Sequence, residues 1–270
     1  ADTATEITIL IDKHYEYSKL YEDIAEMQAL GSMRKFYTND AGYALAKQVD
    51  RHLHMLGATF NGGSIAGATN LYEKAVIGGD GSTLFSGATP GNATALTDAG
   101  LRKMIQTMED SDISSDELNI VIPPVEAAVL RGIARFTEQA FKGNGDTIST
   151  GRLGNLYGTE VYTSTNCPWV HVNSVTSTQS VTFAAAAPTG AAYVDAFNLT
   201  VDWSTSSPTD TKYRACMIMH KDAMALATQQ SIRSQSQYKQ EYLGTLVTSD
   251  TVYGVKELRD YAALAFMVPA

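Results

Sequence analysis

A long stretch without proline constrains the fold more than any other feature of this sequence. Residues 32–58 contain no proline, and apolar side chains recur at Leu45, Val49, Leu53 and Leu56. These spacings of four, four and three residues place the side chains on one face of an α-helix. A helix over the whole stretch would be roughly 40 Å long, well above the usual three or four turns. The sequence therefore predicts one long helix that acts as a strut.

Composition narrows the class of protein. The 270 residues include 44% hydrophobic residues, enough for a buried core, and no window approaches the length of a membrane-spanning helix. The formal net charge of −9 opposes contact with phosphate groups, which argues against sequence-specific DNA binding. Cys167 and Cys216 are the only cysteines, too few for a disulfide framework. The chain starts at Ala1 without a secretion signal, and we expect both a reducing cytoplasm and a preceding segment.

The first half of the chain predicts strands and helices in alternation. Residues 6–12 are rich in β-branched residues and predict a strand. Thr97 is a candidate N-cap for a helix, because apolar residues follow it at helical spacing. Residues 118–122 predict a buried strand, and the prolines that follow introduce a helix whose apolar pattern is Val125, Val129, Ile133 and Phe136.

The second half predicts a β-rich region followed by mixed structure. Residues 159–163 predict a short strand, and residues 169–211 are rich in Thr, Ser and Val with strand-like runs broken by turn residues. After a strand at 216–219, we expect a helix at about 223–230, a polar loop through Gln240 and a closing apolar strand. The fold class is therefore α+β.

Candidate catalytic and metal-binding residues give weak signals. His52 and His54 are two positions apart on the predicted helix, so their rings point about 200° apart, and a solvated helix face explains them better than a metal site. Cys167 and His171 are close in sequence, but catalytic Cys/His pairs need a spatial arrangement and signatures that this sequence does not have. We expect no catalytic residue, no metal and no cofactor.

Several short motifs, in this order, resemble the major capsid proteins of tailed bacteriophages, whose fold is named after phage Hong Kong ninety-seven. The resemblance spans nearly the whole chain and is closest to the capsid proteins of short-tailed phages. It rests on Glu6-Ile-Thr-Ile, Tyr21-Glu-Asp-Ile, Leu118-Asn-Ile-Val-Ile-Pro-Pro, Gly158-Thr-Glu-Val-Tyr-Thr-Ser and Met219-His-Lys-Asp-Ala-Met, with Val252-Tyr-Gly near the end. Each motif alone is a packing or turn pattern, and their order carries the information.

The resemblance implies a domain arrangement. Residues 1–12 would be the end of an extended-loop strand. Residues 13–111 and 246–270 would form a peripheral domain of a sheet and a long spine helix at about 32–58. Residues 112–245 would form an axial domain, a central sheet flanked by helices, with a β-rich insertion at about 169–211.

The resemblance also implies a structural function. Identical subunits would assemble as pentamers and hexamers into an icosahedral shell around the double-stranded DNA of a phage, after assembly in the bacterial cytoplasm. Further partners would be scaffolding, portal and decoration proteins. Candidate contacts between subunits are Ile7, Ile9 and Ile11 in the first strand, and Arg233 and Lys239 in the polar stretch 229–241. We expect no Lys–Asn crosslink, because the extended loop that carries the lysine in some members is not recognisable here.

Three alternatives remain from the sequence. An encapsulin-type nanocompartment has the same fold but encloses enzymes. A hydrolase would use Cys167 and His171, and a host-attachment protein would use the β-rich residues 169–211. The enclosed cargo, a Cys167→Ala variant and the presence of shells distinguish them.

Overall fold

The structure is a computed structural model that consists of two compact units. It describes residues 6–28, 33–58, 60, 76–81, 94–133, 154–174, 179–184, 201–203, 213–259 and 262–269. Unit 1 contains Ala1–Leu53 and Ala225–Lys256, and unit 2 contains His54–Met224 and Glu257–Ala270. Among the helices of the described residues, none combines the length and apolar character needed to cross a membrane.

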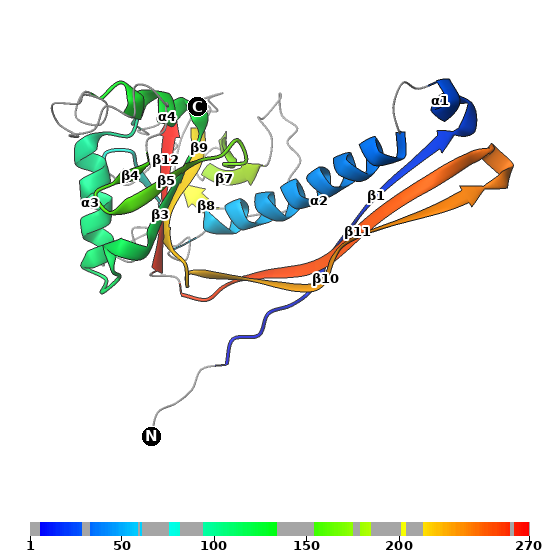
Figure 1. The fold of residues 1–270 in the computed structure, drawn as a ribbon. Coiled ribbons are helices and arrows are strands. Elements are labelled where there is room, and N and C mark those ends of the chain that lie inside the picture. The colour runs from blue at the N-terminus through cyan, green and yellow to red at the C-terminus, as the bar shows by residue number, and fades with distance from the viewer. Residues whose placement is uncertain are drawn as a thin grey trace. The chain divides into compact units, whose positions relative to one another are not determined.

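Unit 1 consists of a three-stranded sheet and a long helix (Figure 1). The strands lie in the order β1 (Lys13–Glu22), β11 (Gly244–Glu257) and β10 (Met224–Lys239). The 3-10 turn η3 (Gln240–Tyr242) connects β10 to β11, and the short helix α1 (Asp23–Gln28) follows β1. The long helix is α2 (Met33–Gly57), whose last turn belongs to unit 2. The predicted strut helix is thus confirmed.

Helix α2 packs along one face of the sheet through aromatic and polar contacts. Tyr21 of β1 stacks on Tyr37, and the Tyr17 hydroxyl donates to a carboxylate oxygen of Asp40 over 2.8 Å. Half-buried and buried residues alternate from Leu246 to Tyr253 in β11, as expected when one face of a strand is covered. Of the apolar residues that predicted the helix, Leu45 is fully buried and the others are partly exposed.

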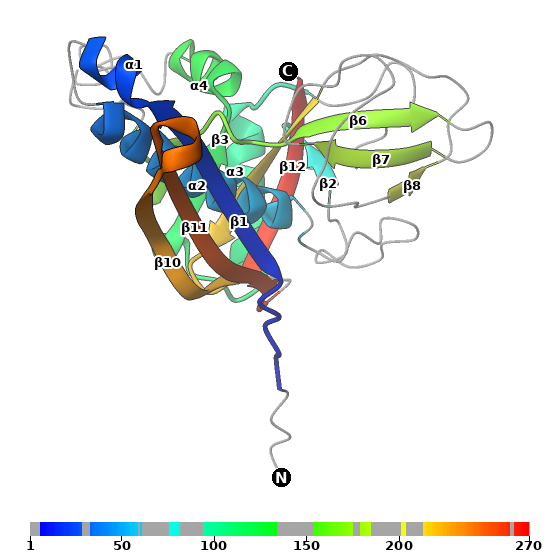
Figure 2. The ribbon, with the colours of Figure 1, turned by 90° about the vertical axis from the view of Figure 1, so that its right-hand side faces the viewer.

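Unit 2 is built on a larger mixed sheet. Its main path is β4 (Asn155–Leu156), β5 (Thr159–Thr163), β3 (Leu118–Ile122), β9 (Tyr213–His220), β6 (Trp169–Ser174), β7 (Gln179–Ala184) and β8 (Val201–Trp203). The last strand, β12 (Ala263–Pro269), pairs antiparallel with β9 and parallel with β2 (Val76–Gly78). Figure 2 shows β6, β7 and β8 side by side, which agrees with the strands predicted in the β-rich stretch.

Two helices cover the core of unit 2. Helix α3 (Asp98–Glu109) begins at Thr97, whose side chain accepts a hydrogen bond from the Gly100 N–H, so the predicted cap is confirmed. Between α3 and β3 lies the 3-10 turn η2 (Ser115–Glu117). Helix α4 (Pro124–Arg131) starts after proline as predicted, but Val125 and Val129 are exposed.

The buried side of α4 consists of Glu126, Ala127 and Leu130. The predicted apolar pattern is therefore wrong at Val125 and Val129, whereas Ile133 is partly buried against the core. Glu126 accepts a hydrogen bond from the Leu96 N–H over 2.7 Å, which satisfies the carboxylate in the core. Burial raises the pKa of Glu126, and the Leu96 hydrogen bond partly offsets this. Phe136 lies outside the described residues.

Two local predictions are wrong. Residues 6–12 are not a strand within the chain, because pairing of β1 with β11 ends at Lys13 opposite Tyr253. The predicted helix at 223–230 and the polar loop through Gln240 are instead β10 and the turn that follows it. Pairing along β11 overrides the helix propensity of Ala, Leu and Gln in this segment.

The two units divide the chain at different points from the predicted domains. Helix α3 and strand β12 fall in the ranges predicted for the domain of the long helix, but they pack in the core of unit 2. The hairpin of β10 and β11 lies mostly in unit 1.

Candidate subunit-contact surfaces

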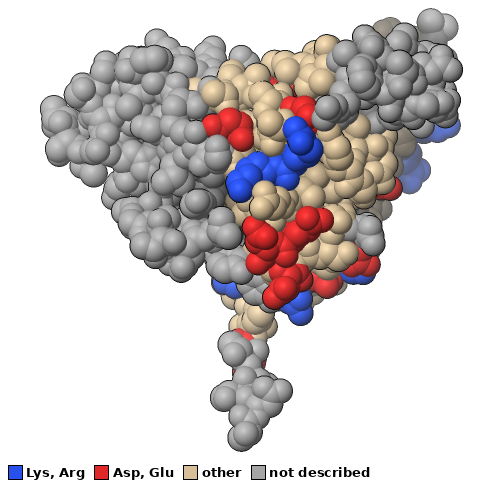
Figure 3. Space-filling model, turned by 90° about the vertical axis from the view of Figure 1, so that its left-hand side faces the viewer, with Lys and Arg blue, Asp and Glu red and all other residues tan. Residues whose placement is uncertain are grey.

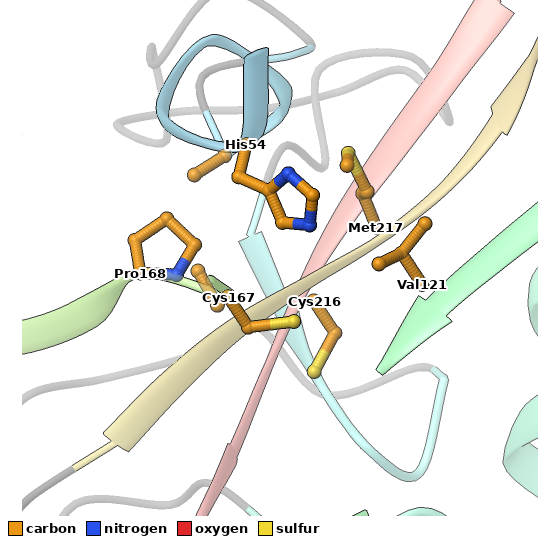
Figure 4. A pocket seen from close by; sticks show the side chains of 8 residues that line it. His54, Val121, Cys167, Pro168, Cys216 and Met217 are labelled. Carbon is orange, nitrogen blue, oxygen red and sulfur yellow. The ribbon is translucent and has the colours of Figure 1, made fainter. Parts of the chain in front are cut away.

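A small buried pocket in unit 2 contains both cysteines, and its geometry gives no support to catalysis. Its lining includes His54, Cys167, Cys216 and Met217 (Figure 4), and the space is too small for a water molecule. Cys167 is buried, so a substrate cannot reach its sulfur, and burial raises the pKa of the Cys216 thiol. The side chain of His171 lies outside the described residues. A Cys/His hydrolase therefore finds no support.

The two histidines of α2 are buried, which corrects the prediction of a solvated helix face. His52 lies in unit 1, where its Nδ1 is 2.6 Å from the Tyr253 hydroxyl and its Nε2 is 3.3 Å from the Tyr15 hydroxyl. His54 instead lines the pocket of unit 2. In the part of the chain that the structure describes, no group of three or more His, Cys, Asp or Glu residues is placed to hold a metal ion.

Large apolar side chains are exposed at one end of unit 1, and we call them the terminal patch. Its members come from α1 and from the end of the β10–β11 hairpin: Ile24, Met27, Tyr238, Tyr242 and Leu243. The Asp23 N–H donates to the Leu243 carbonyl over 3.0 Å, and the Tyr238 hydroxyl donates to Asp23 over 2.9 Å. These bonds hold α1 against the hairpin, and Figure 1 shows both at the same end of the sheet.

The exposure of this patch is large enough to need an explanation. Met27 is 78% exposed and Leu243 is 67% exposed. Leu243 also has a φ of 44°, in the left-handed region where glycine or asparagine is the usual choice. A strained turn that carries an exposed leucine is a typical sign of a contact surface, because neither feature stabilises the free chain.

The segment 6–12 is a second exposed apolar surface. Ile7, Leu10 and Ile11 are exposed and Ile9 is half-buried. This segment continues directly from β1 but makes no ladder with another described strand. The backbone of Leu10 and Ile11 lies close against Gly254 of β11, so a Cβ atom at Gly254 would overlap the Leu10 carbonyl oxygen.

The predicted contact residues Arg233 and Lys239 both lie on β10, the outer strand of the sheet. The Arg233 guanidinium donates from Nε and Nη2 to the two carboxylate oxygens of Asp250, over 2.7 and 3.0 Å. Gln230 also donates to Asp250, over 2.8 Å, and Arg233 holds the pKa of Asp250 below its usual range. Lys239 is half-buried. Arg233 is thus held in place by its own chain.

Charged side chains of both signs gather on the face of unit 2 that carries α3 (Figure 3). Arg102 and Lys103 are exposed in the middle of α3, and Glu109, Asp110 and Asp112 are exposed at its C-terminal end. Acidic residues at that end oppose the helix dipole, so they do not stabilise the helix. This face therefore carries no single sign of charge.

Comparison with known proteins identifies the family. A family model described as phage capsid protein matches residues 20–235, more than half of the chain. The chain belongs to the phage capsid protein family. A capsid protein has a structural role in the virion. No curated protein matches the sequence of this capsid protein.

Three solved phage structures are similar to this capsid protein at low sequence identity. The match to the structure titled Mycobacterium phage Che8 has 16% sequence identity and a TM-score of 0.60, and it covers 98% of this chain and 76% of the phage chain. The match to the capsid of cyanophage P-SCSP1u has 15% sequence identity and a TM-score of 0.61, and it covers 99% of this chain and 79% of the cyanophage chain. The match to the capsid of Ralstonia phage GP4 has 14% sequence identity and a TM-score of 0.62, and it covers 97% of this chain and 74% of the Ralstonia phage chain. The predicted α+β capsid fold is thereby confirmed.

The contact residues named from the sequence stay a prediction, and the structure adds an exposed surface that the sequence analysis did not name. Ile7, Ile11 and Arg233 are exposed as a contact would require. The terminal patch was missed, although Tyr242 and Leu243 carry a recognisable signal: two large apolar residues stand at a hairpin turn where Gly, Asn or Asp is preferred.

Proposed function

We propose that this capsid protein assembles as pentamers and hexamers into a closed icosahedral shell that encloses the double-stranded DNA of a phage. The observation that carries the proposal is the pair of exposed apolar surfaces on unit 1, the terminal patch and the segment 6–12. A free chain gains nothing from either surface, and a symmetric assembly buries both.

The two units correspond in this proposal to the domains of the resemblance. Unit 1, with its long helix and open sheet, would be the peripheral domain. Unit 2, whose central sheet packs in one core with α3 and α4, would be the axial domain, and β6 to β8 would belong to an inserted β element. We propose that the terminal patch contacts the terminal patches of subunits in neighbouring capsomers. This apolar contact would replace the charged contact that the sequence predicts at Arg233 and Lys239.

The charge of the chain supports containment of DNA without tight binding. A net charge of −9 opposes adhesion of the wall to packaged DNA. Assembly would take place in the cytoplasm of the host bacterium, with scaffolding, portal and decoration proteins as further partners. The phage capsid family disfavours the encapsulin-type nanocompartment, and the nature of the enclosed cargo distinguishes the two experimentally.

Electron microscopy of the expressed chain, alone and with the scaffolding protein of its phage, tests the proposal. We expect closed shells tens of nanometres across from the wild type. A Tyr242→Asp/Leu243→Asp variant should lose them, because the two carboxylates would be buried without partners at each contact. Val125→Asp, on the exposed face of α4, is the matched control and should still form shells. Wild-type chains that remain monomers or small oligomers would overturn the proposal.

A further inference from the structure

The two cysteines of the chain lie beside each other in unit 2, although they are far apart in the sequence. Strand β6 pairs antiparallel with β9, and just before this ladder the Ala215 N–H donates to the Pro168 carbonyl over 2.9 Å. Continuing the same register by one residue brings Cys167 opposite Cys216. Figure 4 shows both side chains at one pocket, which both residues line.

The position of the two cysteines suits a covalent bond between their sulfurs. Ala215 and Pro168 face each other across a backbone hydrogen bond, so the next pair along the ladder is one without such a bond. The Cα atoms of such a pair are about 4.5 Å apart in a regular antiparallel sheet, and their side chains are close. A disulfide spans Cα atoms about 4.4–6.8 Å apart. The register of β6 on β9 therefore brings Cys167 and Cys216 within the range of a disulfide.

Strand β6 is attached to the central sheet by a narrow contact. Among the described residues its ladder with β9 consists of two pairs, Trp169 with Arg214 and Val170 with Tyr213. Strand β7 pairs with β6, and β8 pairs with β7, so in this part of the structure the three strands join the sheet through β6. A covalent bond next to the two pairs would fix all three strands to β9.

Access to the two sulfurs depends on the same narrow contact. Cys167 is 1% exposed and Cys216 is 2% exposed, and the pocket has no room for a water molecule, so an oxidant reaches neither sulfur while β6 is attached. Burial, together with the neighbouring Cys167, raises the pKa of the Cys216 thiol, which slows oxidation further. Detachment of two residue pairs needs less free energy than unfolding of unit 2, and it exposes both sulfurs.

We propose that Cys167 and Cys216 form a disulfide that fixes β6 to β9 when the protein leaves a reducing compartment. Thiols stay reduced in a bacterial cytoplasm, whereas disulfides form and persist at the surfaces of released virions. The bond itself depends on unit 2 alone, and the moment of its formation rests on the proposed function. Subunits would assemble with both thiols reduced, and shells released from the host would acquire the bond.

The reaction is thiol–disulfide exchange with a low-molecular-weight disulfide such as oxidised glutathione. Cys167 lies in the turn before β6 and reacts first: its thiolate binds one sulfur of the oxidant and displaces the other as a thiolate. The Cys216 thiolate then attacks the Cys167 sulfur and displaces the second small thiol. The protein loses two protons and two electrons, and the oxidant is reduced to two thiols.

Mass spectrometry of the full chain tests the bond. We expect the wild type, first reduced and then incubated with oxidised glutathione in its native state, to lose two hydrogens and to bind no N-ethylmaleimide after unfolding. Trypsin should then release residues 153–212 linked to residues 215–221. The bond should raise the urea midpoint of unfolding by roughly 1 M, because it restricts the unfolded chain. Two alkylated thiols, a stable glutathione adduct or a link between two chains would overturn the proposal.

A relocated cysteine provides the matched control. The Cys216→Ala/Ala263→Cys chain keeps two buried cysteines in unit 2, but Ala263 pairs with Met219, roughly 10 Å along β9 from position 216. This chain and Cys167→Ala should form no internal link, and the oxidant should not change their urea midpoints. A link that forms as fast in the relocated pair as in the wild type would mean that the register of β6 on β9 does not direct the bond, and the proposal would fail.

Alkylation at the moment of lysis tests when the bond forms. Shells from cells lysed in N-ethylmaleimide should carry two alkyl groups on each chain, and shells kept in aerated medium before alkylation should carry none. Bonded chains at the moment of lysis would overturn the proposed timing. Absence of shells would instead reject the proposed assembly, and the mass of the unassembled chain would still decide whether the bond forms.

Discussion

Strands β9 and β10 follow one another in the chain, with only residues 221–223 between them, yet their environments are opposite. The first six residues of β9 are all buried, and it has β3, β6 and β12 as neighbours. Most residues of β10 are exposed, and β11 is its only neighbour among the described strands. The sequence follows this division, because β9 is apolar with Cys, Met and Ile while β10 is rich in Gln and Ser.

The difference separates the residues that stabilise a single subunit from the residues that are available for contacts with other subunits. Unit 2 buries its strands within its own core, which includes Ile120, Ile218 and Phe266. Unit 1 covers only one face of a narrow sheet with α2 and leaves an edge and an end exposed. We therefore expect changes in β9 to act on the folding of each subunit and changes in β10 to act on assembly.

The largest expected effect is a matched pair of isoleucine truncations. Ile218 in β9 is 0% exposed, and Ile218→Ala should lower the free energy of unfolding by about 2–5 kcal/mol. Ile232 in β10 is 41% exposed, and Ile232→Ala should change it by less than about 1 kcal/mol. Urea unfolding of the free chains gives both values. Equal losses in the two variants would break the comparison between the strands.

The same contrast explains how far the sequence predicts the fold. The Thr97 cap and the apolar strands β3, β9 and β12 follow from local patterns, because their burial is decided within one unit, and the long helix follows from the helical spacing of its apolar residues. Strand β10 was predicted as helix and loop, since Ala, Leu, Gln and Ser carry no strand signal and only the pairing with β11 makes it a strand.

The candidate contacts are predictable only in part, and for a related reason. Ile7 and Ile11 are recognisable as candidate contacts because they belong to a strand-like pattern of β-branched residues. The pattern does not indicate which chain would supply the partner strand. The burial of polar residues such as Glu126 and His52 cannot be predicted from local sequence patterns either, because their hydrogen-bond partners come from distant parts of the sequence.

The second prediction concerns a closely packed part of unit 1. His52 is buried against Tyr15, Gln48 and Tyr253, and burial, with a smaller effect of the Lys13 charge, lowers its pKa to about 4. Since the unfolded chain binds this proton at about pH 6.5, stability is fully present above that pH and is lost as pH falls towards 4. The loss from this group should total about 3 kcal/mol.

Unfolding free energies measured between pH 7 and pH 4.5 test this expectation. The wild type should lose stability towards acid, and His52→Gln, which keeps a side chain able to form hydrogen bonds to the tyrosines, should lose less over the same range. His14→Gln is the comparison variant, because its ring is mostly exposed and the loss of its ion pair with Asp250 should change the slope less than the loss of buried His52 does. Identical slopes in all three chains would show that His52 does not couple folding to pH.

The smallest expected effects come from one substitution made in each unit, and they should differ in sign. Gly100 begins α3 so close to the turn at Gly79 that a Cβ atom would overlap the Gly79 carbonyl oxygen, so Gly100→Ala should cost about 1–3 kcal/mol. Gly42 lies within α2 with open space around the Cβ position, so Gly42→Ala should stabilise the chain by about 0.5–1 kcal/mol. Thermal unfolding of both variants gives the signs. A destabilising Gly42→Ala would mean that this position, too, lies against another part of the subunit, and the open character assigned to unit 1 would have to be confined to β10 and the terminal patch.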